Sequence, residues 1–306
     1  MEKSDLLNIS TDIASALATN KPVVALESTV IAHGLPRPTN LELAQRLETD
    51  LRTASVSPAT IGIIGGELTV GLNHEQIRLL AEDSSVKKIS TRDVPVAIAR
   101  GWNGATTVAS TSWIAHRAGI QVFATGGIGG VHRGDSGDVS HDLVALANTP
   151  IAVVSAGAKA ILDLPRTLEA LETLGVLVVG YRTTDLPAFY ARTSGLALEH
   201  RCDDATALAA ICRARWALDQ GGVLVCNPIP EVAALTLDAA IATALADAAA
   251  AGVTGKKLTP FLLARIAAVT SGASITANRA LAIHDAEVAA ELAVALDSAA
   301  RDDRTR

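Results

Sequence analysis

The stretch "IQVFATGG" (residues 120–127) places an apolar run directly before a pair of glycines. Similar aliphatic runs recur in "IAVVSAG" (151–157), "GVLVVGY" (175–181) and "GGVLVCN" (221–227). Uninterrupted runs of this length predict strands that are buried on both faces, as in a parallel sheet covered by helices. The centre of the chain is therefore predicted to be a parallel sheet whose strands end in loops.

The same alternation continues on both sides of this centre. Further strands are predicted at 22–27, 59–66 and 86–90, with 67–72 forming a hairpin with the second of them. Amphipathic helices are predicted at 40–54, 73–82 and 106–119, and the Ala-rich chain from residue 231 onward is predicted to be helical. Strands that alternate with helices predict a three-layer α/β/α fold with a mostly parallel central sheet. We expect one domain over residues 1–306 with a helical C-terminal portion.

Composition excludes several classes of function. The 306 residues carry a net charge of −6 and no basic cluster, which argues against a nucleic-acid partner. Three cysteines without C-x-x-C spacing argue against a disulfide framework or a cysteine zinc site. No apolar segment is long enough to span a bilayer, and the N-terminus does not resemble a signal peptide. The sequence predicts a cytoplasmic protein that acts on a small molecule, not on a membrane.

Ligands of such sheets bind at the carboxyl ends of the strands, where the loops leave. The glycine-rich loop "ATGGIGGVHRGDSGDVSHD" (124–142) lies at one of these ends. It is not a dinucleotide fingerprint, because His132 stands where the third glycine belongs and charged residues follow. It also lacks the Gly-Lys-Ser/Thr of a phosphate-binding P-loop. Its glycines either expose backbone N–H groups to an anion or permit a tight turn.

Two residues at strand ends are candidates for catalysis. Lys159 follows the strand "IAVVS" across three small residues, and apolar walls there would favour the neutral, nucleophilic amine. The alternative is a solvated lysine at a helix start, which the positive end of the helix dipole disfavours. Glu27 ends the run "PVVAL" and is a candidate general acid. The alternative is a carboxylate that caps the next element or pairs with an arginine.

The remaining candidates are a cation site and an anion site. Asp138 and Asp142, with Asp135 nearby, are loop carboxylates of the kind that bind Mg²⁺ or Mn²⁺. By spacing alone, Asp138 is equally well placed to cap a helix near residue 140. His132 and His141 are either ligands or hydrogen-bonding groups. Lys88, Arg92 and the segment 103–111 form a second group, which is either a phosphate site or an ordinary threonine-capped helix.

Long blocks of sequence carry a family resemblance that these single motifs do not. The chain resembles the pseudouridine-5′-phosphate glycosidase family, also called indigoidine synthase A-like, over roughly residues 10–290. The blocks are "KPVVALESTVIAHGLPRPTN" (21–40), "GWNGATTVAST" (101–111), "VFATGGIGGVHRG" (122–134), "SAGAKAILDLPRTLE" (155–169), "GGVLVCNPIPE" (221–231) and "GKKLTPFLLARI" (255–266). The resemblance implies reversible, metal-dependent cleavage of the C–C glycosidic bond of pseudouridine 5′-phosphate to uracil and ribose 5-phosphate. It also implies a carbon–oxygen lyase that forms homotrimers, with one Mn²⁺ or other divalent cation per subunit.

The resemblance assigns roles by motif position. It implies that Glu27 is the proton donor and that Lys159 is the nucleophile, which forms a Schiff base with the ring-opened sugar. It implies that Asp138 binds the metal. Substrate contacts are implied for Lys88, Val108, His132 and the segment Ser140, His141 and Asp142. The spacer "DSGD" (135–138) departs from the family pattern, so Asp135 is an alternative metal ligand, and His141 is an unexpected residue within its segment.

Three other functions are compatible with the same residues. A sugar kinase of related fold would carry an Asp where "AGAK" has Lys159. A class I aldolase would also use a Schiff-base lysine but would need neither uracil nor a metal. A non-catalytic binding protein is disfavoured by the intact Glu27 and Lys159.

Overall fold

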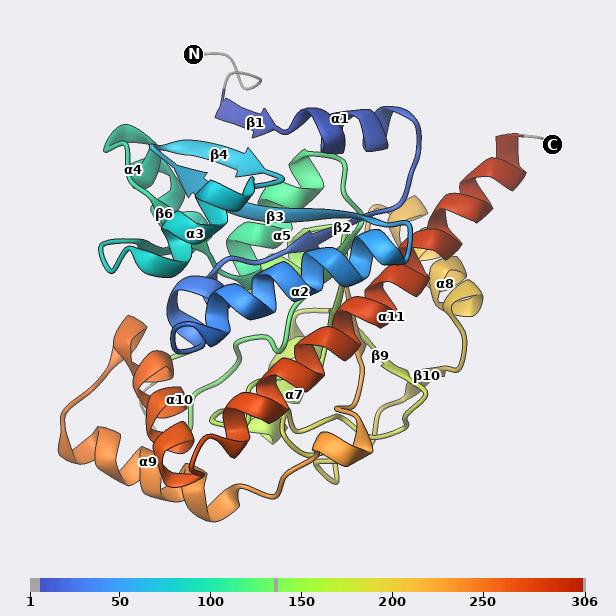
Figure 1. The fold of residues 1–306 in the computed structure, drawn as a ribbon. Helices are drawn as coiled ribbons and strands as arrows, with labels where there is room; N and C mark the ends of the chain where they lie inside the picture. The colour runs from blue at the N-terminus through green and yellow to red at the C-terminus, as the bar shows by residue number, and fades with distance from the viewer. Residues whose placement is uncertain (1–5, 135–136, 305–306) are drawn as a thin grey trace.

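A twisted, mostly parallel sheet forms the centre of the computed structural model, which describes residues 6–134 and 137–304 (Figure 1). Its strands lie in the order β1-β4-β3-β2-β7-β8-β11-β9-β10, and β6 joins β3 to β5. Among the strand pairs of the described residues, β3–β4 and β3–β6 are antiparallel and the others are parallel. The strands are β1 Leu7–Ile9, β2 Val23–Leu26, β3 Ser57–Ile64, β4 Glu67–Val70, β5 Lys87–Ile89, β6 Gly104–Thr106, β7 Val122–Ala124, β8 Ala152–Ser155, β9 Leu177–Tyr181, β10 His200–Cys202 and β11 Val223–Cys226.

Helices cover both faces of this sheet. On one face the long α11 packs against β2, β7 and β8 and against α2 and α8, and Figure 1 shows α2 and α11 in front of the strands with α5 behind them. The helices are α1 Thr11–Ala18, α2 Thr39–Thr53, α3 His74–Glu82, α4 Val94–Ala99, α5 Val108–Arg117, α6 His141–Asn148, α7 Leu164–Thr173, α8 Ala205–Ala217, α9 Asp238–Ala250, α10 Leu258–Val269 and α11 Ala273–Arg304. A π-helical turn, η2, spans Val30–Gly34. In the part of the chain described, no single helix is long and apolar enough to cross a membrane.

The predicted fold class is confirmed, with strands near every aliphatic run and a helical C-terminal portion. The strands β2, β7, β8 and β11 are buried at every position, which explains why their sequences are uninterrupted aliphatic runs. The hydrophobic core that contains them extends from Ile13 to Leu296. Asn73 caps α3 through a capping box with Gln76.

Two details of the sequence interpretation were wrong. The helix predicted from residue 106 begins at Val108, because Gly104–Thr106 is the strand β6. A Cβ at Gly104 would lie 2.5 Å from Ile89 Cγ1, so this glycine permits close strand packing. The edge strands β1 and β10 were not predicted. Each has three residues and only one neighbouring strand, so neither is an uninterrupted buried run.

Candidate active site

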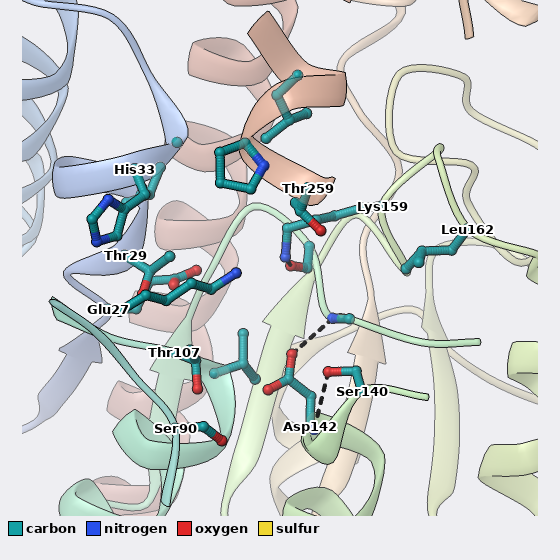
Figure 2. Close-up of a pocket in the computed structure, with 18 of the residues that line it drawn as sticks. Glu27, Thr29, His33, Ser90, Thr107, Ser140, Asp142, Lys159, Leu162 and Thr259 are labelled. Atoms are coloured by element: carbon teal, nitrogen blue, oxygen red, sulfur yellow. Dashed lines mark hydrogen bonds between the residues drawn. The ribbon is translucent and has the colours of Figure 1, made fainter. Parts of the chain in front are cut away.

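A pocket of about 270 Å³ opens at the carboxyl ends of the central strands (Figure 2). Its walls come from the segments that follow β2, β5, β7 and β8 and from the helices α5, α6, α10 and α11. All of the residues predicted from the sequence line it, namely Glu27, Lys88, Val108, His132, Asp138, Ser140, His141, Asp142 and Lys159. Residues separated by more than 130 positions therefore meet in one site, as the strand-end rule predicts.

Glu27 lies directly after β2 and is only 7 % exposed. The hydroxyl of Thr125, at the end of β7, donates a hydrogen bond to its Oε1. Burial raises the pKa of Glu27, while Lys159, Thr125 and Lys88 act in the opposite direction. A buried carboxyl group with a raised pKa retains its proton to higher pH than an exposed one, which suits a group that donates a proton.

Lys159 lies in the turn between β8 and α7, and not at a helix start as the alternative interpretation had it. The helix α7 begins at Leu164, where Asp163 caps it by accepting from the Arg166 N–H. The Nζ of Lys159 donates to the carbonyl of Gly127 at 2.5 Å. Figure 2 shows the amine directed into the pocket. The lysine is thus held against the glycine-rich loop, with its amine in the pocket.

Gly157 determines how the chain reaches Lys159. Its φ is +78°, a conformation that favours glycine, and a Cβ at this position would lie 2.5 Å from the carbonyl oxygen of Pro187. The turn after β8 therefore depends on this glycine both for its backbone conformation and for space. Gly157, one of the three small residues before Lys159, thus directs the chain into the pocket.

The glycines of the loop 124–142 are small because protein packs against them. A Cβ at Gly129 would lie 2.3 Å from Ser140 Oγ, and one at Gly130 would lie 2.4 Å from Thr167 Oγ1. Gly127 is closed in by the ring of Phe189 in the same way. None of these three glycines has a positive φ. These glycines therefore permit close packing of the loop and are not required for a positive φ.

Asp142 joins the glycine-rich loop to the start of α5. Its Oδ1 accepts from the Ala109 N–H and its Oδ2 from the Gly129 N–H, each at 2.9 Å. The carboxyl group is 6 % exposed. Ser140 caps α6 and accepts from the Asp142 N–H, while His141 is exposed at the rim of the pocket. Two of the three residues in the predicted substrate segment therefore also build the site itself.

Asp138 places a partly exposed carboxylate at the pocket, where it could hold a cation. Its carboxylate is 42 % exposed, lines the pocket and lies 3.8 Å from the Nε2 of His132. It does not cap α6, because Ser140 does. Burial lowers the pKa of His132, and Asp138 opposes this effect. The alternative ligand Asp135 lies outside the described residues.

The fit of this site to a divalent metal follows from its donors. Within residues 6–134 and 137–304, no group of three His, Cys, Asp or Glu side chains converges as a metal cage would require. A single exposed carboxylate fits Mg²⁺ or Mn²⁺ that retains most of its water. Such a cation would be held weakly by the protein and would depend on the substrate for further ligands.

Charged and hydroxyl groups gather at the α5 end of the pocket. Lys88 on β5, Ser90 and Arg92 line it together with Thr107, the N-cap of α5, and the first helical residue Val108. The combination of cations and a helix N-terminus is typical of a phosphate site. The threonine-capped helix expected from the sequence is present, and Lys88 and Arg92 line the same pocket.

Several lining residues were not predicted from the sequence. His33 on η2, Phe189 and Asn278 on α11 line the pocket, as do Thr259, Pro260 and Leu263 on α10. Asn278 lies in the long helix α11, whose sequence pattern indicates an apolar face but does not distinguish one polar residue as a pocket residue. His33 and the α10 residues fall inside blocks that carried the family resemblance, and that context was the available signal.

Comparison with known proteins identifies close relatives of the whole chain. The family model described as indigoidine synthase A like protein matches residues 12–295. A pseudouridine-5′-phosphate glycosidase of Caldanaerobacter subterraneus subsp. tengcongensis is 50 % identical over 297 residues, which cover 95 % of this chain and 97 % of the relative. The enzyme of the same name from Escherichia coli K12 is 52 % identical over 296 residues, which cover 94 % and 95 % of the two chains.

Two solved structures share the fold. The prealnumycin C-glycosynthase AlnA, solved in complex with ribulose 5-phosphate, superposes with a TM-score of 0.90 at 43 % identity and covers 99 % of this chain and 100 % of its own. An indigoidine synthase A-like protein from Thermotoga maritima gives a TM-score of 0.88 at 35 % identity, with 95 % and 97 % coverage. The likeness therefore extends over the sheet, the pocket and the C-terminal helices together.

Proposed function

Because this chain belongs to the indigoidine synthase A-like family, we propose that it cleaves the C–C glycosidic bond of pseudouridine 5′-phosphate, reversibly, to uracil and ribose 5-phosphate. The observation that carries this proposal is the pairing of Glu27 and Lys159 in one pocket. Glu27 is a buried acid with a raised pKa, and Lys159 is a lysine held on the neighbouring loop. The choice of substrate rests on relatives about 50 % identical that carry the name pseudouridine-5′-phosphate glycosidase.

The chemistry explains why a lysine is needed. A C–C glycosidic bond offers no leaving oxygen or nitrogen to protonate, so the two-carboxylate route of ordinary glycosidases is unsuited to it. In the direction of synthesis, the amine of Lys159 adds to the open-chain aldehyde at C1′ of ribose 5-phosphate, and loss of water gives a Schiff base. A carbon of uracil then adds to C1′, the imine electron pair passes to the lysine nitrogen, which takes up a proton, and the same uracil carbon loses its hydrogen as a proton. The sugar hydroxyl closes the ring at C1′, gives up its proton and displaces the lysine as the free amine. Cleavage is the reverse sequence.

Glu27 is assigned the proton transfers of ring opening and closure. Its proton is retained by burial, and Thr125 holds the carboxyl group in position at the end of β7. General acid–base catalysis of this kind contributes roughly 10²–10⁴-fold. Lys88 and the start of α5 are assigned to the phosphate or sugar oxygens, and His132 and Ser140 to other substrate contacts.

Mn²⁺ or another divalent cation belongs to the proposal, with Asp138 as its protein ligand. Such a cation would stabilise developing negative charge on the substrate. A homotrimer in the cytoplasm is likewise proposed, with a small molecule as the partner. The three cysteines of the chain, Cys202, Cys212 and Cys226, are buried and unpaired, as expected in a reducing compartment.

The direct test mixes purified protein with pseudouridine 5′-phosphate and follows the absorbance change of uracil release, with Mn²⁺ and with EDTA. Metal-dependent release of free uracil is the expected result. If folded protein releases no uracil under either condition, the proposed substrate is wrong. Product formation from a sugar phosphate without uracil would favour the aldolase alternative.

A further inference from the structure

Phe189 has a backbone conformation that residues of its size seldom adopt. It lies in the segment between β9 and β10, and its φ is +62°. A bulky side chain in this left-handed region is a strained outlier. Such strain persists only where the surrounding structure holds it, and it gathers at functional sites. The neighbours of Phe189 therefore indicate what the conformation serves.

Hydrogen bonds and a second ring hold Phe189 in place. Its N–H donates to the carbonyl of Ala156 at 3.1 Å, in the turn that leads from β8 to Lys159. The next carbonyl along the chain, of Tyr190, accepts from the Leu235 N–H at 2.8 Å. The rings of Phe189 and Tyr190 pack edge to face, with centroids 4.7 Å apart and planes at 77°. The ring of Phe189 is thus fixed between this turn and the protein interior.

The fixed ring packs against the backbone of the glycine-rich loop. A Cβ at Gly127 would lie 2.7 Å from two carbons of the Phe189 ring, and one at Gly126 would lie 3.8 Å from the same ring. Protein interiors are close-packed, so a backbone without side chains takes its position from the group that lies against it. The ring of Phe189 therefore sets where the Gly127 peptide lies.

Lys159 is attached to this same part of the loop at both of its ends. Its backbone N–H donates to the Ile128 carbonyl at 3.1 Å, and its Nζ donates to the Gly127 carbonyl at 2.5 Å. An amine that donates one N–H to a fixed carbonyl directs its lone pair away from that carbonyl. A protonated Schiff-base nitrogen keeps one N–H, so the same carbonyl can accept before and after the lysine has reacted.

We propose that Phe189 is a positioning residue for Lys159. Its ring holds the Gly127 carbonyl, and this carbonyl orients the amine toward the open-chain aldehyde of the sugar. The inference rests on the proposed function, in which Lys159 is the nucleophile. Phe189 is 2 % exposed and acts through the loop, without contact to the substrate. A reacting group displaced by about 1 Å can lose roughly 10²-fold in rate, while the assigned phosphate contacts, Lys88 and the start of α5, lie on other segments.

The test separates binding of the sugar phosphate from adduct formation in the wild type, Phe189→Ala and Phe189→Leu. Binding is measured by calorimetry with ribitol 5-phosphate, which has no aldehyde and cannot react with an amine. Adduct formation is measured with saturating ribose 5-phosphate, quenched with borohydride at timed intervals and quantified on the peptide that contains Lys159. Phe189→Ala should form the adduct roughly 10- to 100-fold more slowly, with the Kd for ribitol 5-phosphate within about twofold of the wild type. Phe189→Leu keeps much of the apolar volume and should recover part of the rate.

Leu208→Ala is the matched control, because it removes a buried side chain of α8 that does not line the pocket. It should lose stability, while adduct formation stays within about twofold of the wild type. If Phe189→Ala does not fold, as judged by circular dichroism, Phe189→Leu alone decides, and it should still be slower than the wild type.

The possible failures are distinct. A wild-type rate of adduct formation in the folded Phe189 variants would overturn the role of Phe189. A loss of rate that is matched by weaker binding of ribitol 5-phosphate, or by an equal loss in Leu208→Ala, would show a general structural role and overturn it as well. If the wild type itself forms no adduct at Lys159, the proposed function fails, and the inference fails with it.

Discussion

Replacing Asp142 with asparagine alters a single atom at the junction of the glycine-rich loop and α5. In the structure both carboxylate oxygens are used, one by the Ala109 N–H and one by the Gly129 N–H. Asparagine retains one acceptor oxygen, now uncharged, and turns an NH₂ group toward the other backbone N–H. The variant therefore loses one charge-assisted hydrogen bond, weakens the other and leaves a buried donor without an acceptor.

The magnitude follows from burial. A hydrogen bond to a charged group is worth about 1.5–3 kcal/mol, and an unsatisfied buried donor costs about 1–3 kcal/mol. Since Asp142 is 6 % exposed, water offers little compensation. Because these contributions overlap, we expect Asp142→Asn to lower the free energy of unfolding by about 2–4 kcal/mol, within the range of a broken buried network.

The assay is urea denaturation followed by circular dichroism, with Asp138→Asn as the matched control. Asp138 lies four residues away in the same loop but is 42 % exposed, so its substitution should change stability by no more than about 0.5 kcal/mol. Equal midpoints for Asp142→Asn and the wild type would refute the reasoning. Asp142 would then act on the substrate alone, as the resemblance implied, and not as a connection between α5 and the loop.

Three further predictions follow from buried groups. Glu27→Gln should lower kcat for uracil release roughly 10²–10⁴-fold. In the wild type kcat should fall as pH rises through the raised pKa of Glu27, and a pH-independent kcat would contradict its role. Burial also raises the pKa of Asp285, so the stability this group contributes is present below its ordinary value of 3.8 and is lost as pH rises toward the folded-state value. Asp285→Asn should therefore gain stability relative to the wild type between pH 4 and pH 8 in thermal melts, and a constant difference would argue against it. Gly157→Ala should lower the free energy of unfolding by about 1–3 kcal/mol, because alanine is strained at a φ of +78°, as denaturation would show. The same variant should slow adduct formation at Lys159, as rapid trapping would show.

The site residues at the strand ends could be predicted from the sequence, because strands are recognised from local patterns. An aliphatic run marks a buried strand wherever it occurs, and Glu27 and Lys159 follow directly after such runs. The rule that ligands bind at the carboxyl ends of parallel strands then brings the two together. Their positions also made Glu27 a candidate general acid and Lys159 a candidate nucleophile. Their specific roles, proton donor and Schiff-base nucleophile, were implied by the family resemblance alone.

Features that depend on contacts between distant segments were not predictable. The glycines of the loop are required by Ser140, Thr167 and Phe189, whose approach no spacing reveals. Asp142 carries a carboxylate of the kind that binds cations, but two backbone N–H groups from different segments donate hydrogen bonds to its oxygens. The contribution of α10 and α11 to the pocket arises from the path of the C-terminal helices, and a helical pattern does not specify where a helix packs.

The most direct test of the account is the site of covalent attachment. Protein incubated with ribose 5-phosphate is reduced with borohydride, digested and mapped by mass spectrometry. We expect a reduced sugar-phosphate adduct on the peptide that contains Lys159, and no adduct in Lys159→Ala. An adduct on another lysine, or one that persists in Lys159→Ala, would contradict the central claim that Lys159 is the nucleophile.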